Sequence, residues 1–348
     1  MILTPVAVAM LSGLVALGIA LAVGLGAAPL GQALGLLDFP DTDGGRKRHA
    51  RVTPLVGGVA LMLATTAACA LTLWLVPVGP WVQQHLTWLG GVLVAMYLIG
   101  FADDRFGLGP IIRLVLTLVA LWLVIEFAPD FSLGFLRFAG QSTVWPIGGW
   151  GGAFALLCLV GLLNAVNMAD GKNGIVLSLG LTWTAVLATR LPAAFLPVLA
   201  ATGVVLAVLL FFNMRGRLFM GDGGSYTLSA LFGLLAILAY NNDFATMRAD
   251  DVAVMFAVPV FDTIRLMVTR RLAGRSPFEG DRDHLHHHLH HRCGWPVGLG
   301  VYVALVALPN FAAVALPGTG LVWLAVSAAC YVATLALTRL PALPSRAP

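Results

Sequence analysis

Eleven apolar runs, separated by loops rich in Gly, Pro and charged residues, constrain what this 348-residue chain can fold into. Most of them reach or approach the length of about 20 apolar residues that a helix needs to cross a bilayer. We therefore predict an all-α polytopic membrane protein, with the helices bundled in a single integral-membrane domain over residues 1–348. The runs lie near residues 4–30, 54–77, 88–102, 110–128, 150–168, 174–190, 192–212, 225–241, 252–270, 299–316 and 319–339.

The composition excludes the main soluble classes of protein. Hydrophobic residues make up 59% of the chain and charged residues only 10%, whereas soluble proteins carry about 25% charged residues. A soluble enzyme, a secreted disulfide scaffold and a disordered chain are therefore excluded. Residues 1–37 carry no charge and so lack the basic start of a signal peptide. Residues 4–30 are therefore predicted to form the first membrane helix.

The basic residues predict the orientation of the chain. If the apolar runs span a bilayer in turn, all but three of the 20 Lys and Arg residues fall in odd-numbered loops, at adjoining span ends or after the last span. The exceptions are Arg137, Arg190 and Arg248. Because basic residues accumulate on the cytoplasmic side, we expect the odd loops and the C-terminus in the cytoplasm and the N-terminus outside.

The polar motifs gather in the same five loops, on the predicted cytoplasmic face. These loops lie near residues 38–53, 103–110, 164–174, 213–225 and 271–298. An active site assembled from all five loops is the simplest explanation of this one-sided pattern.

Two adjacent carboxylates, Asp103 and Asp104, end the third predicted span. Acidic side chains at a helix C-terminus oppose the helix dipole, and their mutual repulsion raises one pKa unless a cation is present. A bound cation, or a proton taken from a substrate, would explain the pair. The alternative is an exposed pair that is neutralised by Arg105.

Amide and acidic side chains also end the fifth predicted span. Asn164, Asn167 and Asp170 follow one another at a spacing of three, which places them roughly on one helix face. Polar groups at this depth need partners, so the motif indicates a ligand. The alternative is that Asp170 or Asn173 only caps the next helix.

The segment FMGDGGS, residues 219–225, opens the eighth predicted span. A Gly-rich turn at a helix N-terminus exposes backbone N–H groups that suit a phosphate, and Asp222 offers the oxygen ligands that Mg²⁺ prefers. The alternative is that Asp222 or Ser225 is an ordinary helix cap.

A His-rich segment follows the ninth predicted span and leaves three interpretations open. They are a zinc or nickel site, a solvated tract without a role, and a phosphate-binding wall in which Arg282 makes bidentate contacts. With Cys293 as the one nearby thiol, classical cysteine-based zinc spacing fails. The segment contains His284, His286, His287, His288, His290 and His291.

Two further sets of charged residues have simpler explanations. Lys47 and His49 lie in a basic run that could serve the site or only orient the chain. Asp262 and Arg265 are three residues apart within the ninth predicted span, so we expect them to pair with each other.

Taken in order, the five motifs resemble those of the polyprenyl-phosphate N-acetylhexosamine-1-phosphate transferases, glycosyltransferase family 4. The resemblance runs from residue 38 to about residue 296, through RKRHARVTPLVGG, GFADDRFGL, NAVNMADG, FMGDGGS and SPFEGDRDHLHH. The spacing of Asp281, Arg282, His284, His286 and His287 is similar to that of the WecA-type branch, which moves GlcNAc 1-phosphate. The branch that moves phospho-MurNAc-pentapeptide has a compact Pro-x-His-His-His motif instead.

The resemblance implies a fold of ten or eleven transmembrane helices, often dimeric, in the bacterial inner membrane. It also implies a reaction, in which HexNAc 1-phosphate passes from UDP-HexNAc to undecaprenyl phosphate with release of UMP. The reaction requires Mg²⁺, with Mn²⁺ as a substitute ion, and starts lipid-linked cell-envelope polysaccharides such as O-antigen. The partners are thus the two substrates and the lipid bilayer, with no nucleic acid.

The resemblance further implies roles for individual residues. The catalytic residues are Asp103, Asp104 and Asp222. Asp103, supported by Asp104, is the base that keeps the lipid phosphate deprotonated, and Asn167 and Asp222 hold the metal ion. Phe219 and Asn173 contact uracil, whereas Arg282 and the His residues hold the sugar and its phosphate. The substrate-binding set comprises Lys47, His49, Asn164, Asp170, Asn173, Phe219, Arg282, His284, His286 and His287.

One departure from the family pattern leaves the sugar open. Many bacterial members have a second Asp where this chain has Asn173, a residue that the eukaryotic dolichol branch also places there. GlcNAc is the expected sugar, and QuiNAc, FucNAc or MurNAc-pentapeptide are the alternatives. A covalent intermediate on Asp222 is an alternative to direct attack. A His-rich metal transporter is a remote alternative, because transporters place ionisable residues near the middle of the membrane.

Overall fold

The structure is an all-α bundle, as predicted. A computed structural model describes residues 3–40, 51–243, 246–276 and 282–339. Within these ranges ten helices are long and apolar enough to cross a membrane. The elements in chain order are α1 (Pro5–Leu25), α2 (Ala27–Leu34), β1 (Leu37–Asp38), β2 (Thr53–Pro54), α3 (Gly57–Leu75), α4 (Pro80–Phe106), α5 (Pro110–Phe127), η1 (Pro129–Phe131), β3 (Phe135–Leu136), β4 (Trp145–Pro146), η2 (Gly148–Trp150), α6 (Gly151–Ala169), α7 (Ile175–Leu187), η3 (Ala193–Phe195), α8 (Leu196–Met214), α9 (Gly221–Asn242), α10 (Ala249–Leu272), α11 (Leu285–Cys293), α12 (Val297–Ala315) and α13 (Gly320–Arg339).

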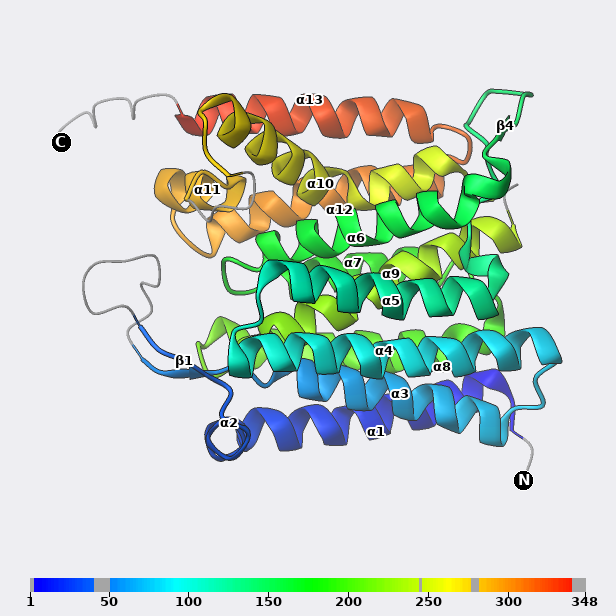
Figure 1. The fold of residues 1–348 in the computed structure, drawn as a ribbon, viewed down its shortest axis with the longest axis horizontal. Coiled ribbons are helices and arrows are strands. Elements are labelled where there is room, and N and C mark those ends of the chain that lie inside the picture. The colour runs from blue at the N-terminus through cyan, green and yellow to red at the C-terminus, as the bar shows by residue number, and fades with distance from the viewer. Residues whose placement is uncertain (1–2, 41–50, 244–245, 277–281, 340–348) are drawn as a thin grey trace.

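The helices lie side by side, so the bundle has two distinct ends (Figure 1). One end carries α2, the antiparallel β1–β2 pair and α11, and we call it the motif end because the loops with the polar motifs lie there. The opposite end carries the antiparallel β3–β4 pair. The described chain begins near the opposite end and finishes at the motif end (Figure 1).

One predicted span is shorter than expected. The apolar run near 174–190 contains α7, which has only 13 residues, Ile175–Leu187. That is about 20 Å of helix, against a hydrocarbon core about 30 Å thick. Pro192 limits the helix because it lacks an N–H group and disfavours helical geometry at the residue before it.

α4 begins earlier than the apolar run near 88–102 predicts. It starts at Pro80, and proline suits the first position of a helix. The polar side chains of its first turns bond to the chain around the end of α5. Trp81 Nε1 donates to Asp130 Oδ2 over 2.6 Å, and Gln84 Nε2 donates to the Phe127 carbonyl over 2.7 Å. The polar residues of this segment resemble those of a loop in the sequence. The segment can be helical because these long-range hydrogen bonds satisfy them.

α9 lies in the interior, where its residues from Gly223 to Tyr240 are all buried, and packs against α3, α4 and α6. Its first turn is the GDGG segment, which is therefore helical rather than a turn ahead of the helix. A Cβ atom at Gly58 would lie 2.4 Å from Gly224 N, and one at Gly100 would lie 2.4 Å from the Asp222 carbonyl. Only glycine allows backbones to approach so closely, so α3 and α4 together hold the turn that carries Asp222.

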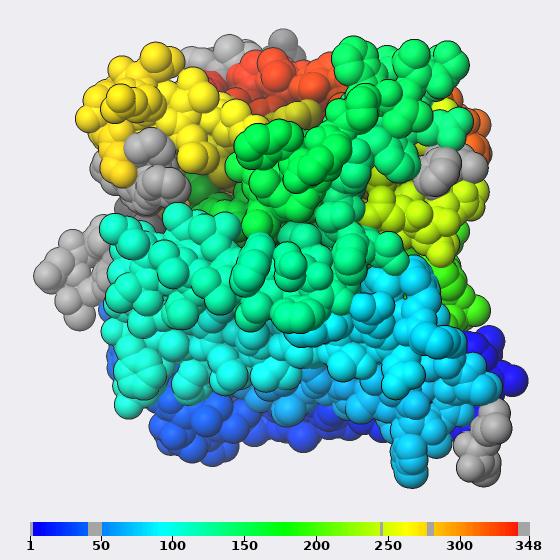
Figure 2. Space-filling model, turned by 45° about the vertical axis from the view of Figure 1, so that its right-hand side comes forward, coloured from blue at the N-terminus to red at the C-terminus, as the bar shows by residue number. Residues whose placement is uncertain are grey.

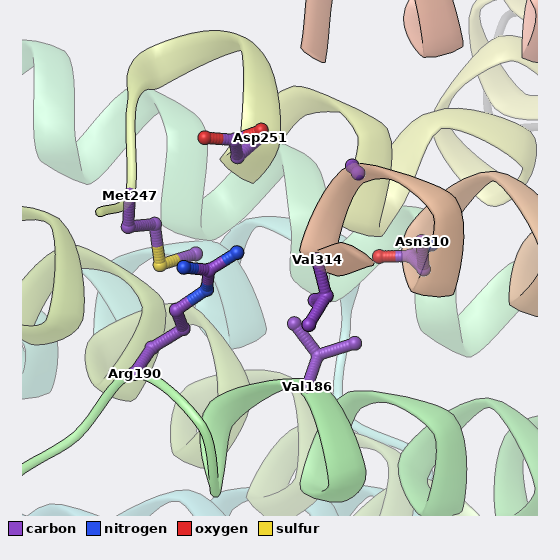
Figure 3. A pocket seen from close by; sticks show the side chains of 7 residues that line it. Val186, Arg190, Met247, Asp251, Asn310 and Val314 are labelled. Carbon is purple, nitrogen blue, oxygen red and sulfur yellow. The ribbon is translucent and has the colours of Figure 1, made fainter. Parts of the chain in front are cut away.

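A small cavity, seen from close by in Figure 3, is lined by the end of α7, the start of α10 and the last turns of α12, at the end of the bundle opposite the motifs. Its volume is about 10 Å³, far below the range usual for ligand pockets. Val186, Arg190, Asp251 and Asn310 are among the side chains that line it. The site built from the five motifs is thus separate from this cavity.

Candidate active site

Three carboxylates meet where α4 ends and α9 begins. Asp103 and Asp104 occupy the last turn of α4, and Asp222 occupies the first turn of α9. The backbone N–H of Gly223 donates to Asp104 Oδ2 over 3.2 Å, which joins the two helices at this point. The side chain of Asp103 is 6% exposed and that of Asp222 is 31% exposed. The structure therefore brings together the three residues predicted to be catalytic.

Arg113 on α5 is the cation that faces these carboxylates, and the sequence analysis did not identify it. Its Nη1 atom lies 2.6 Å from Asp103 Oδ2 and 3.9 Å from Asp222 Oδ2. Arg105, the neighbour considered as a partner, instead lies against Gly35 and the Phe106 ring. Arg113 is ten residues from Asp103 on the next helix, so only the packing of α4 on α5 reveals the pair.

Asn167, predicted as a metal ligand, contacts Asp222 directly. Its Nδ2 atom donates to Asp222 Oδ1 over 2.6 Å and to Ser225 Oγ over 3.0 Å. Because both hydrogen bonds use the amide nitrogen of Asn167, its amide oxygen makes neither of them. Asn164 lies one turn earlier in α6, where its Nδ2 atom donates to the Val160 carbonyl over 2.8 Å. This hydrogen bond is thus within its own helix.

The chain between α6 and α7 places Asp170 close to the carboxylates. Asp170 is the C-cap of α6, and burial together with the negative charges of Asp222 and Asp104 holds its pKa well above the usual range. The left-handed conformation of Gly174 (φ 89°) turns the chain into α7, and its N–H donates to Asn213 Oδ1 over 2.7 Å. This turn holds Asp170 beside Asp222 without a cap made by Asp170 or Asn173 on α7.

The His-rich segment forms a compact cluster beside that turn. His284 is the N-cap of α11 and stacks on His286, with ring centroids 5.2 Å apart and planes 11° from parallel. The centroid of His287 lies 4.3 Å from that of His286. His286 is 1% exposed, and a Cβ atom at Gly171 would lie 2.4 Å from its Nε2 atom. Gly171 therefore lets the chain after α6 pack directly on the His286 ring.

The buried ring of His286 and the half-buried ring of His287 are neutral at ordinary pH. Burial holds the pKa of His286 well below its usual range, and the neighbouring His287 lowers it further. Burial and the positive charge of Arg282 lower the pKa of His287 to about 4. Burial and Arg282 also lower the pKa of Lys172. Arg282, Lys172 and the imidazole rings thus form one wall, in which the positive charges of Arg282 and Lys172 favour an anion.

The lowered pKa of His287 predicts a loss of stability in acid. The unfolded chain takes up a proton near pH 6.5, whereas folded His287 does so only near pH 4. The unfolded state therefore binds more protons between these values, and stability falls as the pH falls through this window. Arg282, Lys172, His284 and His288 all face His287 and oppose its protonation. We expect Tm to decrease from pH 6.5 to pH 4, with a shallower slope in His287→Gln.

The control for this measurement is His291→Gln, since His291 lies exposed on the same helix. Its slope of Tm against pH is expected to match that of the unmodified protein. An equal slope in His287→Gln would show that the acid loss arises elsewhere.

The turn before α12 contributes a residue that the motifs do not include. Trp295 Nε1 donates to the Asn173 carbonyl over 3.1 Å, and the Lys172 ammonium lies 5.8 Å from the centre of the Trp295 ring. Trp295 thus ties the chain after α6 to the end of the His-rich segment. The Asn173 side chain, predicted to contact uracil, is held in place through its own backbone.

Other predicted site residues lie at the same end of the bundle or outside the described residues. Phe219 is anchored through its backbone, because its N–H donates to the Pro54 carbonyl over 2.8 Å and its carbonyl accepts from Gly57 N over 2.9 Å. Lys47, His49 and Asp281 lie outside the described residues. In Figure 2 the surface is hollowed between the yellow α10 region and the cyan to teal α4–α5 region.

The predicted pair of Asp262 and Arg265 is confirmed, with 2.9 Å between Arg265 Nη2 and Asp262 Oδ1. The residues whose role the sequence left open also have partners. His288 Nε2 lies 2.7 Å from Asp283 Oδ1, and Cys293 Sγ donates to the Leu289 carbonyl of its own helix.

The donor set around Asp222 suits a hard cation. Within the described part of the chain, no three His, Cys, Asp or Glu side chains are grouped as metal ligands. Mg²⁺ usually binds one or two carboxylates and takes its other oxygen ligands from substrate phosphates and water. The Asp222 carboxylate with the Asn167 amide oxygen fits that mode, and Asp104 lies close by to add negative charge.

Comparison with known proteins agrees with this geometry. The profile of Glycosyl transferase family 4 matches residues 86–240, which include Asp103, Asp104, Asp170 and Asp222. Similar proteins include the probable undecaprenyl-phosphate N-acetylglucosaminyl 1-phosphate transferase of Bacillus subtilis, 26% identical over 74% of this chain and 70% of that protein. The undecaprenyl-phosphate alpha-N-acetylglucosaminyl 1-phosphate transferase of Escherichia coli K12 is 28% identical over 74% and 69%. The decaprenyl-phosphate N-acetylglucosaminephosphotransferase of Mycolicibacterium smegmatis is 29% identical over 70% and 66%.

These matches support the family that the five motifs predict. With its ten long apolar helices, the chain is a multi-pass membrane protein whose residues 86–240 match glycosyl transferase family 4.

Proposed function

We propose that this protein transfers HexNAc 1-phosphate, with GlcNAc as the expected sugar, from UDP-HexNAc to undecaprenyl phosphate and releases UMP. The product would be the lipid-linked sugar pyrophosphate that starts a cell-envelope polysaccharide. The observation that carries the proposal is the meeting of Asp103, Asp104 and Asp222 with the wall of Arg282, Lys172 and His rings at one end of the bundle. The activities named for the similar proteins support the same reaction.

The charges of the site suit a reaction between two anions. Phosphoryl transfer depends mainly on positioning and on neutralising charge. Asp103 would accept the proton of the lipid phosphate, whose oxygen then attacks the phosphorus that carries the sugar. The bond from that phosphorus to the UMP oxygen breaks, and UMP leaves. Arg113, 2.6 Å from Asp103, would attract the phosphate of the lipid.

A metal ion has a suitable place beside the attacked phosphorus. Asp222 and Asn167 would hold Mg²⁺, with Mn²⁺ as a substitute, and Asp104 would support them from α4. When bound, the ion would neutralise charge on the diphosphate. Burial and the charges of Asp222 and Asp104 raise the pKa of Asp170, which reduces its repulsion of an anionic substrate.

The cationic wall would hold the donor. Arg282 can contact phosphate oxygens in a planar bidentate manner. The ring of His287 is neutral, so it can donate one hydrogen bond without placing another positive charge near the metal ion. Phe219 would stack on uracil and Asn173 would contact its edge. Lys47 and His49 complete the proposed set from the first loop, with Lys47 near the lipid phosphate.

The proposal includes orientation in the bacterial inner membrane, with the motif end in the cytoplasm. The undecaprenyl chain would then stay in the bilayer while its phosphate reaches Asp103. Labelling of single cysteines introduced at Arg275 and Ser142, which lie at the two ends, tests this in intact cells. Modification of the Arg275 position from outside the cell would reverse the orientation.

The test of the reaction is UMP release by purified protein with undecaprenyl phosphate and separate UDP-sugars. We expect turnover with UDP-GlcNAc, loss of turnover when EDTA removes divalent ions, and recovery when Mg²⁺ is restored. Turnover with UDP-QuiNAc, UDP-FucNAc or UDP-MurNAc-pentapeptide alone would keep the reaction and change the sugar. A phosphorylated Asp222 with ping-pong kinetics would replace direct attack by a covalent route. Absence of UMP with every donor would refute the proposed function.

A further inference from the structure

Asp262 is a buried carboxylate that joins three helices. It lies on α10 and is 4% exposed. Its Oδ2 atom lies 3.0 Å from His284 Nδ1, and Leu285 N donates to both of its oxygens over 3.3 Å. Its Oδ1 atom accepts from Arg265 Nη2 and from the Tyr331 hydroxyl, each over 2.9 Å. One carboxylate thus receives donors from α10, from the start of α11 and from α13.

The neighbouring Asp283 forms a second connection between the same elements. Its Oδ2 atom accepts from Arg265 Nη1 over 2.7 Å, and both of its oxygens accept from Arg339 Nη2 over 2.7 Å. Tyr331 also accepts a hydrogen bond from Arg265 Nε over 2.9 Å. The segment that precedes α11 is therefore held from one side by α10 and from the other by the final helix, α13.

This network determines how His284 is oriented. A carboxylate beside one imidazole nitrogen fixes the tautomer, because Nδ1 carries the proton that it donates to Asp262. Nε2 is then the nitrogen left to face a ligand. Because His286 stacks on His284 with planes 11° apart and packs on Gly171, the same contact also sets the position of the wall beside Asp170.

α11 needs such support from outside. It has nine residues, fewer than the 12 to 15 or so at which an isolated helix becomes even marginally stable. Leu285, whose N–H points at Asp262, is its first residue, and an anion at a helix N-terminus is stabilising. Asp262 therefore stabilises the start of α11 with both of its oxygens and orients the His284 ring with one of them, Oδ2.

We propose that Asp262 and Tyr331 are positioning residues that set the affinity for the diphosphate of the donor by orienting His284. The inference rests on the proposed function. Neither residue belongs to the five motifs, and Tyr331 lies on the last helix, 69 residues from Asp262. Asp262 acts through His284, and Tyr331 acts through Asp262, since its hydroxyl restrains the carboxylate.

The test is a steady-state comparison of Asp262→Asn and Tyr331→Phe with the unmodified protein. A hydrogen bond to a charged group is worth enough for about a tenfold change in affinity. We expect the KM for the UDP-sugar to rise about tenfold in Asp262→Asn and about fivefold in Tyr331→Phe. The kcat and the KM for undecaprenyl phosphate should change less than about twofold. Thr338→Val removes a hydroxyl from the same helix outside the network and should change none of these values.

A double-mutant cycle with His284→Ala separates positioning from a general structural role. If Asp262 acts through His284, Asp262→Asn should have no further effect on donor KM once His284→Ala is present. Additive effects, or a lower kcat with unchanged donor KM, would overturn the inference.

Calorimetry with UDP and Mg²⁺ on the same proteins separates this inference from the proposed reaction. UDP carries the diphosphate, so its binding needs no turnover. Weaker UDP binding in Asp262→Asn, absent in the His284→Ala background, would support the inference even if no donor yields UMP. Unchanged UDP binding in Asp262→Asn, or no UDP binding by the unmodified protein, would overturn it.

Discussion

Replacing Asp222 by Asn is expected to lower UMP release at least about 10³-fold, because the change removes one negative charge where the proposed cation and the diphosphate meet. The shape of the side chain is nearly unchanged, because Asn is close to isosteric with Asp. The Asn167 Nδ2 atom, now 2.6 Å from Asp222 Oδ1, can still donate to an amide oxygen. The loss should therefore come from charge and not from unfolding. Initial rates at several Mg²⁺ concentrations measure it.

The matched control is Asp130→Asn at the opposite end of the bundle. Asp130 also accepts a side-chain hydrogen bond, from Trp81 Nε1 over 2.6 Å, so both variants lose one carboxylate that has a single short N–H donor. Asp130→Asn should keep full turnover. Near-normal rates in Asp222→Asn at saturating Mg²⁺ would remove Asp222 from the metal site, whereas equal loss in both variants would point to unfolding.

Gly100→Ala is expected to have the second largest effect, with about a 10²-fold lower turnover and a lower Tm. A Cβ atom at this position would lie 2.4 Å from the Asp222 backbone carbonyl and from Gly223 N. Those atoms belong to backbone, which cannot rotate away as a side chain can, so α4 and α9 must move apart. A displacement of about 1 Å at a catalytic group is enough to cost about 10²-fold in rate.

Gly91→Ala is the matched control for this change. Gly91 lies on the same helix, and a Cβ atom there would meet nothing within 4 Å. Its Tm and turnover are expected to equal or slightly exceed those of the unmodified protein, because alanine favours the helix. Normal turnover in Gly100→Ala would show that the close approach of α4 to α9 does not position Asp222.

Local patterns account for most of the fold. A helix that crosses lipid needs a long apolar run and makes all its backbone hydrogen bonds internally, so ten spans could be located without knowledge of their neighbours. The errors arise where a helix begins or ends because of contacts with distant segments or a local break. α4 starts at Pro80 because Trp81 and Gln84 find partners around the end of α5. α7 stops at Leu187 although its run continues.

The sequence predicted which residues belong to the candidate site better than it predicted which of them contact one another. The motifs identified Asp103, Asp104, Asp222 and Asn167, which the structure places together. Arg113 was missed because its nearest carboxylate belongs to the preceding helix, and the sequence offered Arg105 as the obvious partner. Trp295 was missed because its contact with Asn173 joins residues 122 positions apart.

An apolar helical bundle with its polar motifs at one end follows from local patterns, because span length and charge placement are properties of each segment separately. Which polar groups meet depends instead on how the helices pack. Glycines at positions 58 and 100 bring α3 and α4 onto the first turn of α9, and Asp262 brings His284 and Tyr331 together. Such contacts depend on the packing of helices far apart in the chain, which no local pattern records.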